Sequence, residues 1–204
     1  MYRHVIWDFD GTLFDTYPVM ASVFQQMLRE QGREEPLETI LETMKISANT
    51  TYVKYGFDPD SISEYKTRKA QDELQTVRPF PDIPKICRFI QEHDGSNYIL
   101  THRGSSTFAL LQAQELTDVF REVVTAEQSF ARKPDPSAIR YLMEKYDLSP
   151  AETIMIGDRE LDVLAGQRAG IDTCLITERL PKATVATYTI QTFNQLSALL
   201  RAKT

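Results

Sequence analysis

From residue 80 onward, short apolar runs alternate with segments of helical periodicity, and this alternation restricts the fold of the chain more than any other feature. Each strand-like run is followed by a helical pattern, as in repeated strand–helix units. Such units favour right-handed crossovers, so their strands lie parallel and helices cover both faces of the sheet. The sequence therefore predicts an α/β fold built on a doubly wound parallel sheet. The expected strands are residues 4–9, 97–101, 122–126, 153–158, 173–177 and, weakly, 187–190, and the expected helices are 83–93, 105–116, 136–146, 160–169 and 192–201.

Residues 15–79 break this alternation. Helical patterns follow one another there, and no strand candidate lies between them. The stretch ends at "RPFPDIP", whose three prolines are typical of a connector. We therefore expect a core domain of residues 1–14 and 80–204, with a small helical domain of residues 15–79 inserted after the first strand.

A polar stretch, "MKISANTTYVKY", separates two helical patterns of this inserted domain. It carries Lys45, Ser47, Asn49 and Thr50, and we expect it to form a loop. Such a loop either faces the core domain and contacts the leaving group of a substrate, or is an exposed connector. The sequence leaves both alternatives open.

Composition excludes several classes of function. With 204 residues, 42% hydrophobic and 25% charged, the chain resembles an ordinary globular protein. A net charge of -6 argues against a nucleic-acid-binding protein, so an anionic substrate must be attracted locally. Cys87 and Cys174 are isolated, which indicates a reducing compartment without disulfides. No apolar run suits a signal segment or a membrane helix, and we expect a cytoplasmic protein, either monomer or homodimer.

Polar side chains gather where the expected strands end. Asp8 and Asp10 follow the first strand, Thr101 ends the second, and Asp158 ends the strand at 153–158. Lys133 lies in a loop directly before a helix. Because ligands of open parallel sheets bind at the carboxyl ends of the strands, we expect these five side chains to share one site.

Metal-assisted phosphoryl transfer is the chemistry that fits this set of groups. One carboxylate can attack phosphorus as a nucleophile, and a second can exchange protons with the leaving group and with water. Mg²⁺ prefers carboxylates and phosphate oxygens, and it would relieve the repulsion between neighbouring acids. Lys133 would steady the nucleophile and a phosphate oxygen, and Thr101 would donate a hydrogen bond to the phosphoryl group. Backbone N–H groups of the loop after Asp8, with Gly11 permitting close approach, would complete a phosphate cradle.

Four segments of the chain carry a resemblance to a known family. "DFDGT", "ILTHR", "RKPDP" and "IGDRELD" are similar, in this order, to the motifs of the haloacid dehalogenase (HAD) superfamily. The chain resembles its phosphoglycolate-phosphatase-like branch, which has a Rossmann-like core and a small helical cap. The resemblance implies that residues 15–79 are a cap that closes over the substrate and excludes water.

The same resemblance implies a role for individual residues. Asp8 would be the nucleophile and Asp10 the general acid and base. Mg²⁺ would be bound by Asp8, the Asp10 carbonyl and Asp158, with Asp162 in support. Gly11 and Thr12, in the first motif, would lie at the phosphate.

The second motif departs from the family pattern. Relatives often have Asn after the Thr or Ser, whereas His102 and Arg103 follow Thr101 here. We include His102 and Arg103 among the candidate phosphate- or substrate-binding residues. The sequence also allows contacts of either residue with the cap or with solvent.

We therefore expect a Mg²⁺-dependent phosphatase of small phosphorylated metabolites, phosphoglycolate-like or sugar phosphates, acting through an aspartyl-phosphate. A phosphomutase on the same scaffold is one alternative, and a non-catalytic binding or regulatory protein is another. Dehalogenases and phosphonatases generally lack the second acid, so Asp10 argues against them.

Overall fold

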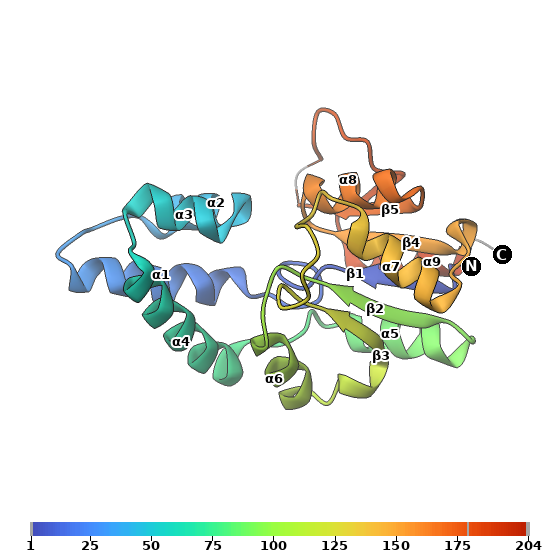
Figure 1. The fold of residues 1–204 in the computed structure, drawn as a ribbon, viewed down its shortest axis with the longest axis horizontal. Helices are drawn as coiled ribbons and strands as arrows, with labels where there is room; N and C mark the ends of the chain where they lie inside the picture. Colours follow the sequence, from blue (N-terminus) through green and yellow to red (C-terminus); the bar gives the residue numbers. More distant parts are fainter. Residues whose placement is uncertain (1, 179, 203–204) are drawn as a thin grey trace. The chain divides into compact units, whose positions relative to one another are not determined.

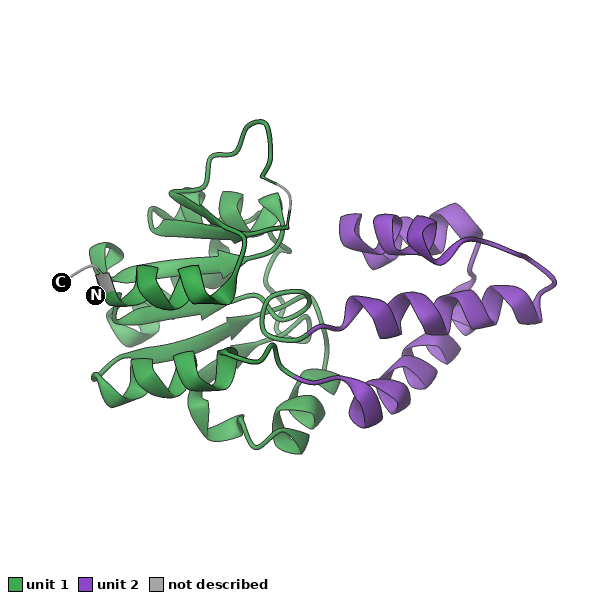
Figure 2. Cartoon of the chain, turned by 180° about the vertical axis from the view of Figure 1, so that it is seen from behind, with its two compact units in different colours: residues 1–14, 79–204 green, residues 15–78 purple. Residues whose placement is uncertain are grey.

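The chain divides into two compact units (Figure 2), seen in a computed structural model that describes residues 2–178 and 180–202. One unit comprises residues 1–14 and 79–204, and the other comprises residues 15–78. The first contains all the strands described below, and the second is helical. Each unit has its own buried hydrophobic cluster.

The larger unit is an α/β structure with a parallel sheet (Figure 1), as the sequence predicts. Within the described residues the sheet has six strands in the order β3-β2-β1-β4-β5-β6, and every neighbouring pair is parallel. The order reverses direction at β1, which places the first strand in the interior of the sheet. The strands are β1 (His4–Trp7), β2 (Ser96–Leu100), β3 (Phe120–Val124), β4 (Thr153–Gly157), β5 (Asp172–Ile176) and β6 (Tyr188–Ile190).

Helices cover both faces of the sheet because the strands bury side chains on both sides. Ile6, Tyr98 and Met155 belong to one cluster with Ile139 of α7 and Ala165 of α8. Residues next to these in each strand point to the opposite face, where α5 packs against β2. The helices of this unit are α5 (Ile83–Glu92), α6 (Ser106–Ala113), α7 (Ser137–Tyr146), α8 (Glu160–Ala169) and α9 (Phe193–Ala202), with short 3₁₀ turns at Thr117–Val119 and Pro150–Glu152.

One strand begins earlier than its sequence pattern predicts. The expected strand at 122–126 is β3, which spans Phe120–Val124 and pairs with β2 from Asn97 onward. Thr125 instead begins a turn, where its N–H and its hydroxyl both hydrogen-bond to Oε1 of Gln128. The β-branched Thr125 continues the strand pattern in sequence, but its hydrogen bonds to the Gln128 side chain begin a turn there.

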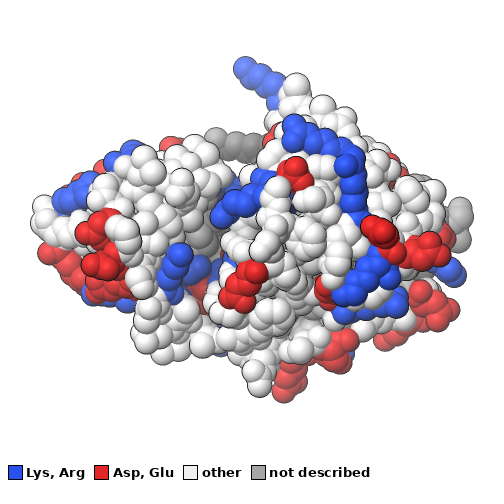
Figure 3. Space-filling view, viewed as in Figure 1, with Lys and Arg blue, Asp and Glu red and all other residues white. Residues whose placement is uncertain are grey.

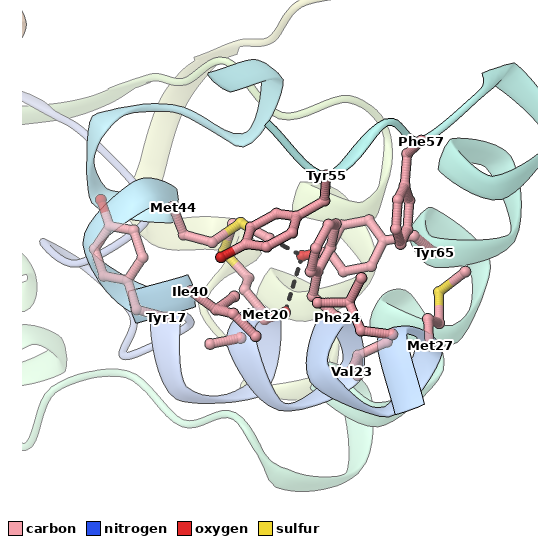
Figure 4. Close-up of a cluster of buried hydrophobic side chains, with 12 residues drawn as sticks. Tyr17, Met20, Val23, Phe24, Met27, Ile40, Met44, Tyr55, Phe57 and Tyr65 are labelled. Carbon is pink, nitrogen blue, oxygen red and sulfur yellow. Dashed lines mark hydrogen bonds between the residues drawn. The ribbon is translucent and has the colours of Figure 1, made fainter. Parts of the chain in front are cut away.

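The helical unit is built around aromatic and sulfur-containing side chains (Figure 4). Phe24 lies at its centre, stacked on Phe57 at a ring-centroid distance of 4.3 Å and edge-on to Tyr65 at 5.5 Å. The buried Tyr65 hydroxyl donates a hydrogen bond of 3.1 Å to the Met20 carbonyl, so its polar atom is satisfied inside the cluster. The helices are α1 (Tyr17–Glu30), α2 (Leu37–Ile46), α3 (Ala48–Tyr55) and α4 (Pro59–Thr76).

The expected polar loop at residues 45–50 is a helix junction, so that prediction is wrong. Lys45 lies in the last turn of α2, and Ser47 caps the start of α3. Ser47 Oγ accepts a hydrogen bond of 3.0 Å from the Thr50 N–H, which satisfies a donor that the first helical turn leaves unpaired. Gly56 ends the helix in the left-handed conformation. Ser47, Asn49 and Thr50 are therefore a helix cap and first-turn residues of α3, roles that suit polar side chains as well as a loop does.

Among the described residues, none of the helices is long and apolar enough to cross a membrane. Acidic and basic side chains both occur on the face drawn in Figure 3. Cys87 and Cys174 are free and buried.

A buried polar residue links three elements of the larger unit. Asn97, in β2, is completely buried. It accepts a hydrogen bond of 3.0 Å from the Trp7 indole and donates to the carbonyls of Cys87 and Val119 at 2.9 and 3.3 Å. It therefore joins β2 to β1, α5 and the 3₁₀ turn at Thr117–Val119 through directional bonds that an apolar residue would not make.

We expect Asn97→Ala to lower the free energy of unfolding of the α/β unit by about 2–4 kcal/mol, because it removes three buried hydrogen bonds and leaves their partners unpaired. Urea unfolding followed by fluorescence of Trp7, the single tryptophan, measures this change. Asn194→Ala, at an exposed position of α9, is the matched control and should change stability by no more than about 0.5 kcal/mol. An unchanged midpoint for Asn97→Ala would contradict the structural role of this network.

Candidate active site

Candidate catalytic residues follow directly from the ends of three central strands. The ladder of β1 continues one residue further, through a hydrogen bond of 2.8 Å from the Asp8 N–H to the Ile156 carbonyl. The Thr101 N–H likewise donates to the Val124 carbonyl at 2.9 Å. Asp158 comes directly after β4. The backbones that carry these side chains are therefore held by the sheet itself.

The loop after Asp8 is a tight turn that uses its own backbone groups. The Phe9 carbonyl accepts hydrogen bonds from the N–H groups of Leu13 and Phe14, at 3.0 and 3.1 Å. Gly11 has φ +75°, which favours glycine, and its N–H donates to the Phe14 carbonyl at 2.8 Å. Gly11 thus shapes the turn, and its N–H is bonded within the loop. Thr12 is fully buried, and its hydroxyl has no hydrogen-bond partner among the described residues.

Lys133 is buried between two carboxylates. Its Nζ lies 2.6 Å from Asp8 Oδ1 and 2.6 Å from Asp162 Oδ1, and it donates to the Leu100 carbonyl at 2.9 Å. The contacts with Asp8 and Leu100 are hydrogen bonds, and the contact with Asp162 is an ion pair. Burial alone lowers the pKa of Lys133, but the adjacent Asp162 and Asp8 outweigh it and raise the pKa, so the side chain is a fixed cation.

Three carboxylates come together at this point. Oxygens of Asp8, Asp158 and Asp162 all lie within 4.8 Å of one another. Gly157 permits the close packing, because a Cβ at this position would overlap the Asp162 side chain. Burial, followed by the repulsion of Asp8, raises the pKa of the Asp162 carboxyl, whereas Lys133 and Arg159 oppose the rise. Asp162 also accepts a hydrogen bond of 3.2 Å from the Arg159 N–H. It therefore links the start of α8 to Lys133.

Arg159 is a site residue that the sequence interpretation did not select. Its Nη2 lies 3.8 Å from Asp8 Oδ2, and its Nε lies 3.9 Å from Asp158 Oδ1. The guanidinium therefore faces two of the three clustered carboxylates. The residue stands within "GDRELD", between two selected acids, and this position was the available signal.

Asp10 is paired with a residue of the second motif. Arg103 Nη1 donates to Asp10 Oδ1 at 2.8 Å, and Nη2 donates to the Ser106 hydroxyl at 3.1 Å. The Arg103 backbone N–H donates to Thr101 Oγ1 at 3.1 Å. The Thr101 oxygen is thus an acceptor from the backbone, and its own proton can be donated elsewhere. Arg103 orients both Asp10 and Thr101.

His102 contacts the backbone of the lysine loop. Its Nε2 accepts a hydrogen bond of 2.9 Å from the Lys133 N–H, which requires a neutral ring with the proton on Nδ1. Burial and the charges of Lys133, Arg132 and Arg159 lower the pKa of His102 to about 3, with Asp10 acting in the opposite direction. His102 therefore contacts the backbone of Lys133 and positions the loop that carries this lysine.

The carboxylate set suits a hard divalent cation. Asp8 Oδ2 is buried and accepts no hydrogen bond from the described residues, although the other oxygen of the same carboxylate is bound by Lys133. A buried carboxylate oxygen without a donor is costly unless a cation approaches it. Oxygen ligands from several carboxylates are the preferred set for Mg²⁺ or Ca²⁺. The residues present thus fit a divalent metal.

Comparison with known proteins agrees with this geometry. The family model "Haloacid dehalogenase-like hydrolase" matches residues 5–176, from β1 to the end of β5. The chain belongs to this family. The matched range holds all four motif segments, so the family expected from them is confirmed, and the chain is a hydrolase by membership.

Two relatives and one solved structure show the extent of the similarity. A phosphoglycolate phosphatase of Nitrosospira multiformis is 28% identical over 181 residues, covering 82% of this chain and 80% of the relative. The pyrophosphatase PpaX of Oceanobacillus iheyensis is 24% identical over 177 residues, covering 85% and 83%. A haloacid dehalogenase-like hydrolase of Streptococcus pneumoniae superposes with a TM-score of 0.79 at 21% identity, covering 98% of each chain. The fold of this HAD-family hydrolase therefore extends over almost the whole chain.

The lowered pKa of His102 makes stability depend on pH. Below about pH 6.5, His102 is protonated in the unfolded chain but stays neutral in the folded protein. The free energy of unfolding therefore falls as the pH decreases from about 6.5 toward 3. We expect the wild type to lose about 1 kcal/mol more than His102→Gln between about pH 7.5 and pH 5.5. Gln keeps an acceptor near the position of Nε2 but does not titrate.

Urea midpoints of both proteins at the two pH values, followed by Trp7 fluorescence, measure this difference. His93→Gln, at an exposed position, is the matched control and should retain the pH dependence of the wild type. An identical loss in wild type and His102→Gln would show that His102 is not held in the neutral form.

Proposed function

We propose that this HAD-family hydrolase is a Mg²⁺-dependent phosphatase of small phosphorylated metabolites, with Asp8 as the nucleophile. The observation that carries the proposal is the Asp8 carboxylate itself. One of its oxygens is bound by Lys133, and the other is buried beside Asp158 without a hydrogen-bond donor. A carboxylate held in this way by Lys133 cannot rotate freely. Its orientation therefore suits attack on a phosphoryl group bound at the ends of the strands.

The first half of the reaction transfers the phosphoryl group to Asp8. An Asp8 oxygen forms a bond to phosphorus, and the bond from phosphorus to the leaving oxygen breaks. Asp10 gives a proton to that oxygen, so the leaving group departs as a neutral hydroxyl. Arg103 supports this role by orienting the Asp10 side chain with a hydrogen bond of 2.8 Å.

The second half hydrolyses the aspartyl-phosphate. Asp10, now deprotonated, takes a proton from a water molecule that attacks phosphorus, and the Asp8 carboxylate is released with free phosphate. The Thr101 hydroxyl donates a hydrogen bond to a phosphoryl oxygen. Its own oxygen already accepts a hydrogen bond from the Arg103 N–H. Lys133, whose Nζ lies 2.6 Å from Asp8 Oδ1, offsets the negative charge of the Asp8 carboxylate when phosphate is released.

Asp8 and Asp158 would hold Mg²⁺ together with the Asp10 carbonyl, and Asp162 would support them by fixing Lys133 and the start of α8. The metal supplies positive charge that lowers the repulsion between the phosphate and the carboxylates as the nucleophile approaches. Asp162 suits a supporting role because its oxygens already face Lys133 and the Arg159 N–H.

The helical residues 15–79 would form the cap that excludes water and selects the substrate. Residues 15–78 form a compact unit with its own buried cluster, inserted between β1 and α5. A unit of this kind can move as a rigid body while the sheet keeps the catalytic groups in place. The names of the relatives, phosphoglycolate phosphatase and pyrophosphatase, suggest a short, highly anionic substrate.

We expect Asp8→Asn to reduce phosphate release by at least about a thousandfold, because it removes the nucleophile while conserving shape. The assay uses phosphoglycolate, sugar phosphates, inorganic pyrophosphate and p-nitrophenyl phosphate, each with Mg²⁺ or with EDTA. EDTA should abolish release by the wild type. The rank order of the substrates identifies what the cap selects.

Asp118→Asn is the matched control, since the Asp118 side chain is exposed and lies 3.8 Å from Arg88 on the surface. It should keep full activity. Equal activity of wild type and Asp8→Asn would exclude Asp8 as the nucleophile. Activity that survives EDTA would exclude the metal.

A further inference from the structure

The Arg159 guanidinium lies at the two carboxylate oxygens that the metal would need. Its Nη2 is 3.8 Å from Asp8 Oδ2, and its Nε is 3.9 Å from Asp158 Oδ1. The side chain is only 17% exposed, so water screens these interactions weakly. The guanidinium therefore interacts with the same negative charge as a bound cation would.

Counting formal charges shows what this neighbour does to the site. Asp8, Asp158 and Asp162 carry three negative charges, and Lys133 neutralises one of them at 2.6 Å. The remaining two charges would match a divalent ion. Arg159 neutralises one more, so the net charge that attracts an approaching divalent ion is halved.

The position of Arg159 in the chain keeps it beside these acids. It is the residue before α8, and its N–H is hydrogen-bonded to Asp162 Oδ2 at 3.2 Å. This bond involves only the backbone of Arg159, so the side chain can be replaced without removing it. The side chain is long and can turn away toward solvent while its backbone stays in place.

We propose that Arg159 competes with the divalent cation for Asp8 and Asp158, so that this arginine sets the metal affinity of the site. The inference rests on the proposed function, which assigns the metal to these carboxylates. Arg159 is a positioning residue here. It offsets the repulsion between the carboxylates when no cation is bound. The cation must displace it, which lowers the affinity of the site for the cation.

The experiment measures Mg²⁺ binding to the full chain by isothermal titration calorimetry after treatment with EDTA and dialysis, without substrate. We expect Arg159→Gln and Arg159→Met to bind Mg²⁺ about five- to twentyfold more tightly than the wild type, because the competing charge is gone. Arg159→Lys keeps the charge and should stay within about twofold of the wild type. Arg88→Gln, which removes an exposed arginine, should leave the affinity unchanged.

Thermal unfolding gives a second readout that is independent of turnover. In EDTA, Arg159→Gln should melt about 2–4 °C below the wild type, because the carboxylates lose a compensating charge. Mg²⁺ should then raise its melting temperature more than that of the wild type.

Unchanged or weaker Mg²⁺ binding in both neutral variants would overturn the role of Arg159 and leave the proposed function intact. Absence of Mg²⁺ binding in the wild type and in all variants would instead overturn the metal site of the proposed function, and this inference with it. Gln and Met differ in polarity, so if one of these variants fails to fold, the other still tests the role of Arg159.

Discussion

The ion pairs of Lys133 with Asp8 and Asp162 are the interactions on which the rest of the site depends. A lysine removed from water is stable as a cation only if oxygens surround it, and here two carboxylates and the Leu100 carbonyl do so. The lysine loop, β1 and α8 are thereby tied together at one point. The ammonium also makes it tolerable to bury the carboxylates of Asp8 and Asp162 side by side.

Other contacts of the site reinforce this arrangement from outside. His102 holds the backbone of Lys133, and Arg103 holds Asp10 and Thr101. The two residues that distinguish the second motif of this chain therefore both act on neighbouring site residues. Arg159 adds a second positive charge beside the acids. The local balance of these charges, rather than the net negative charge of the chain, decides how strongly cations and phosphates are attracted.

The sequence predicted the fold where periodicity and topology act together. Alternating strands and helices gave the parallel sheet, and the rule that ligands bind at the carboxyl ends of strands brought Asp8, Thr101, Lys133 and Asp158 to one edge. Local details were less predictable, because one residue type serves several purposes. Ser47 and Thr50 are as suitable for a helix cap as for a loop, and Thr125 continues a strand pattern while its hydrogen bonds to the Gln128 side chain begin a turn. The pairing of Arg103 with Asp10, 93 residues apart, has no local signal in the sequence.

A covalent intermediate on Asp8 is the central claim, and rapid quenching tests it most directly. The wild type would be mixed with p-nitrophenyl phosphate and Mg²⁺, quenched in acid within the first turnover, and reduced with borohydride, which converts an aspartyl-phosphate to homoserine. Peptide mass spectrometry then locates the change. The account predicts homoserine at position 8, and none in Asp8→Asn. Phosphate release with an unmodified Asp8, or with the modification at another residue, would contradict it.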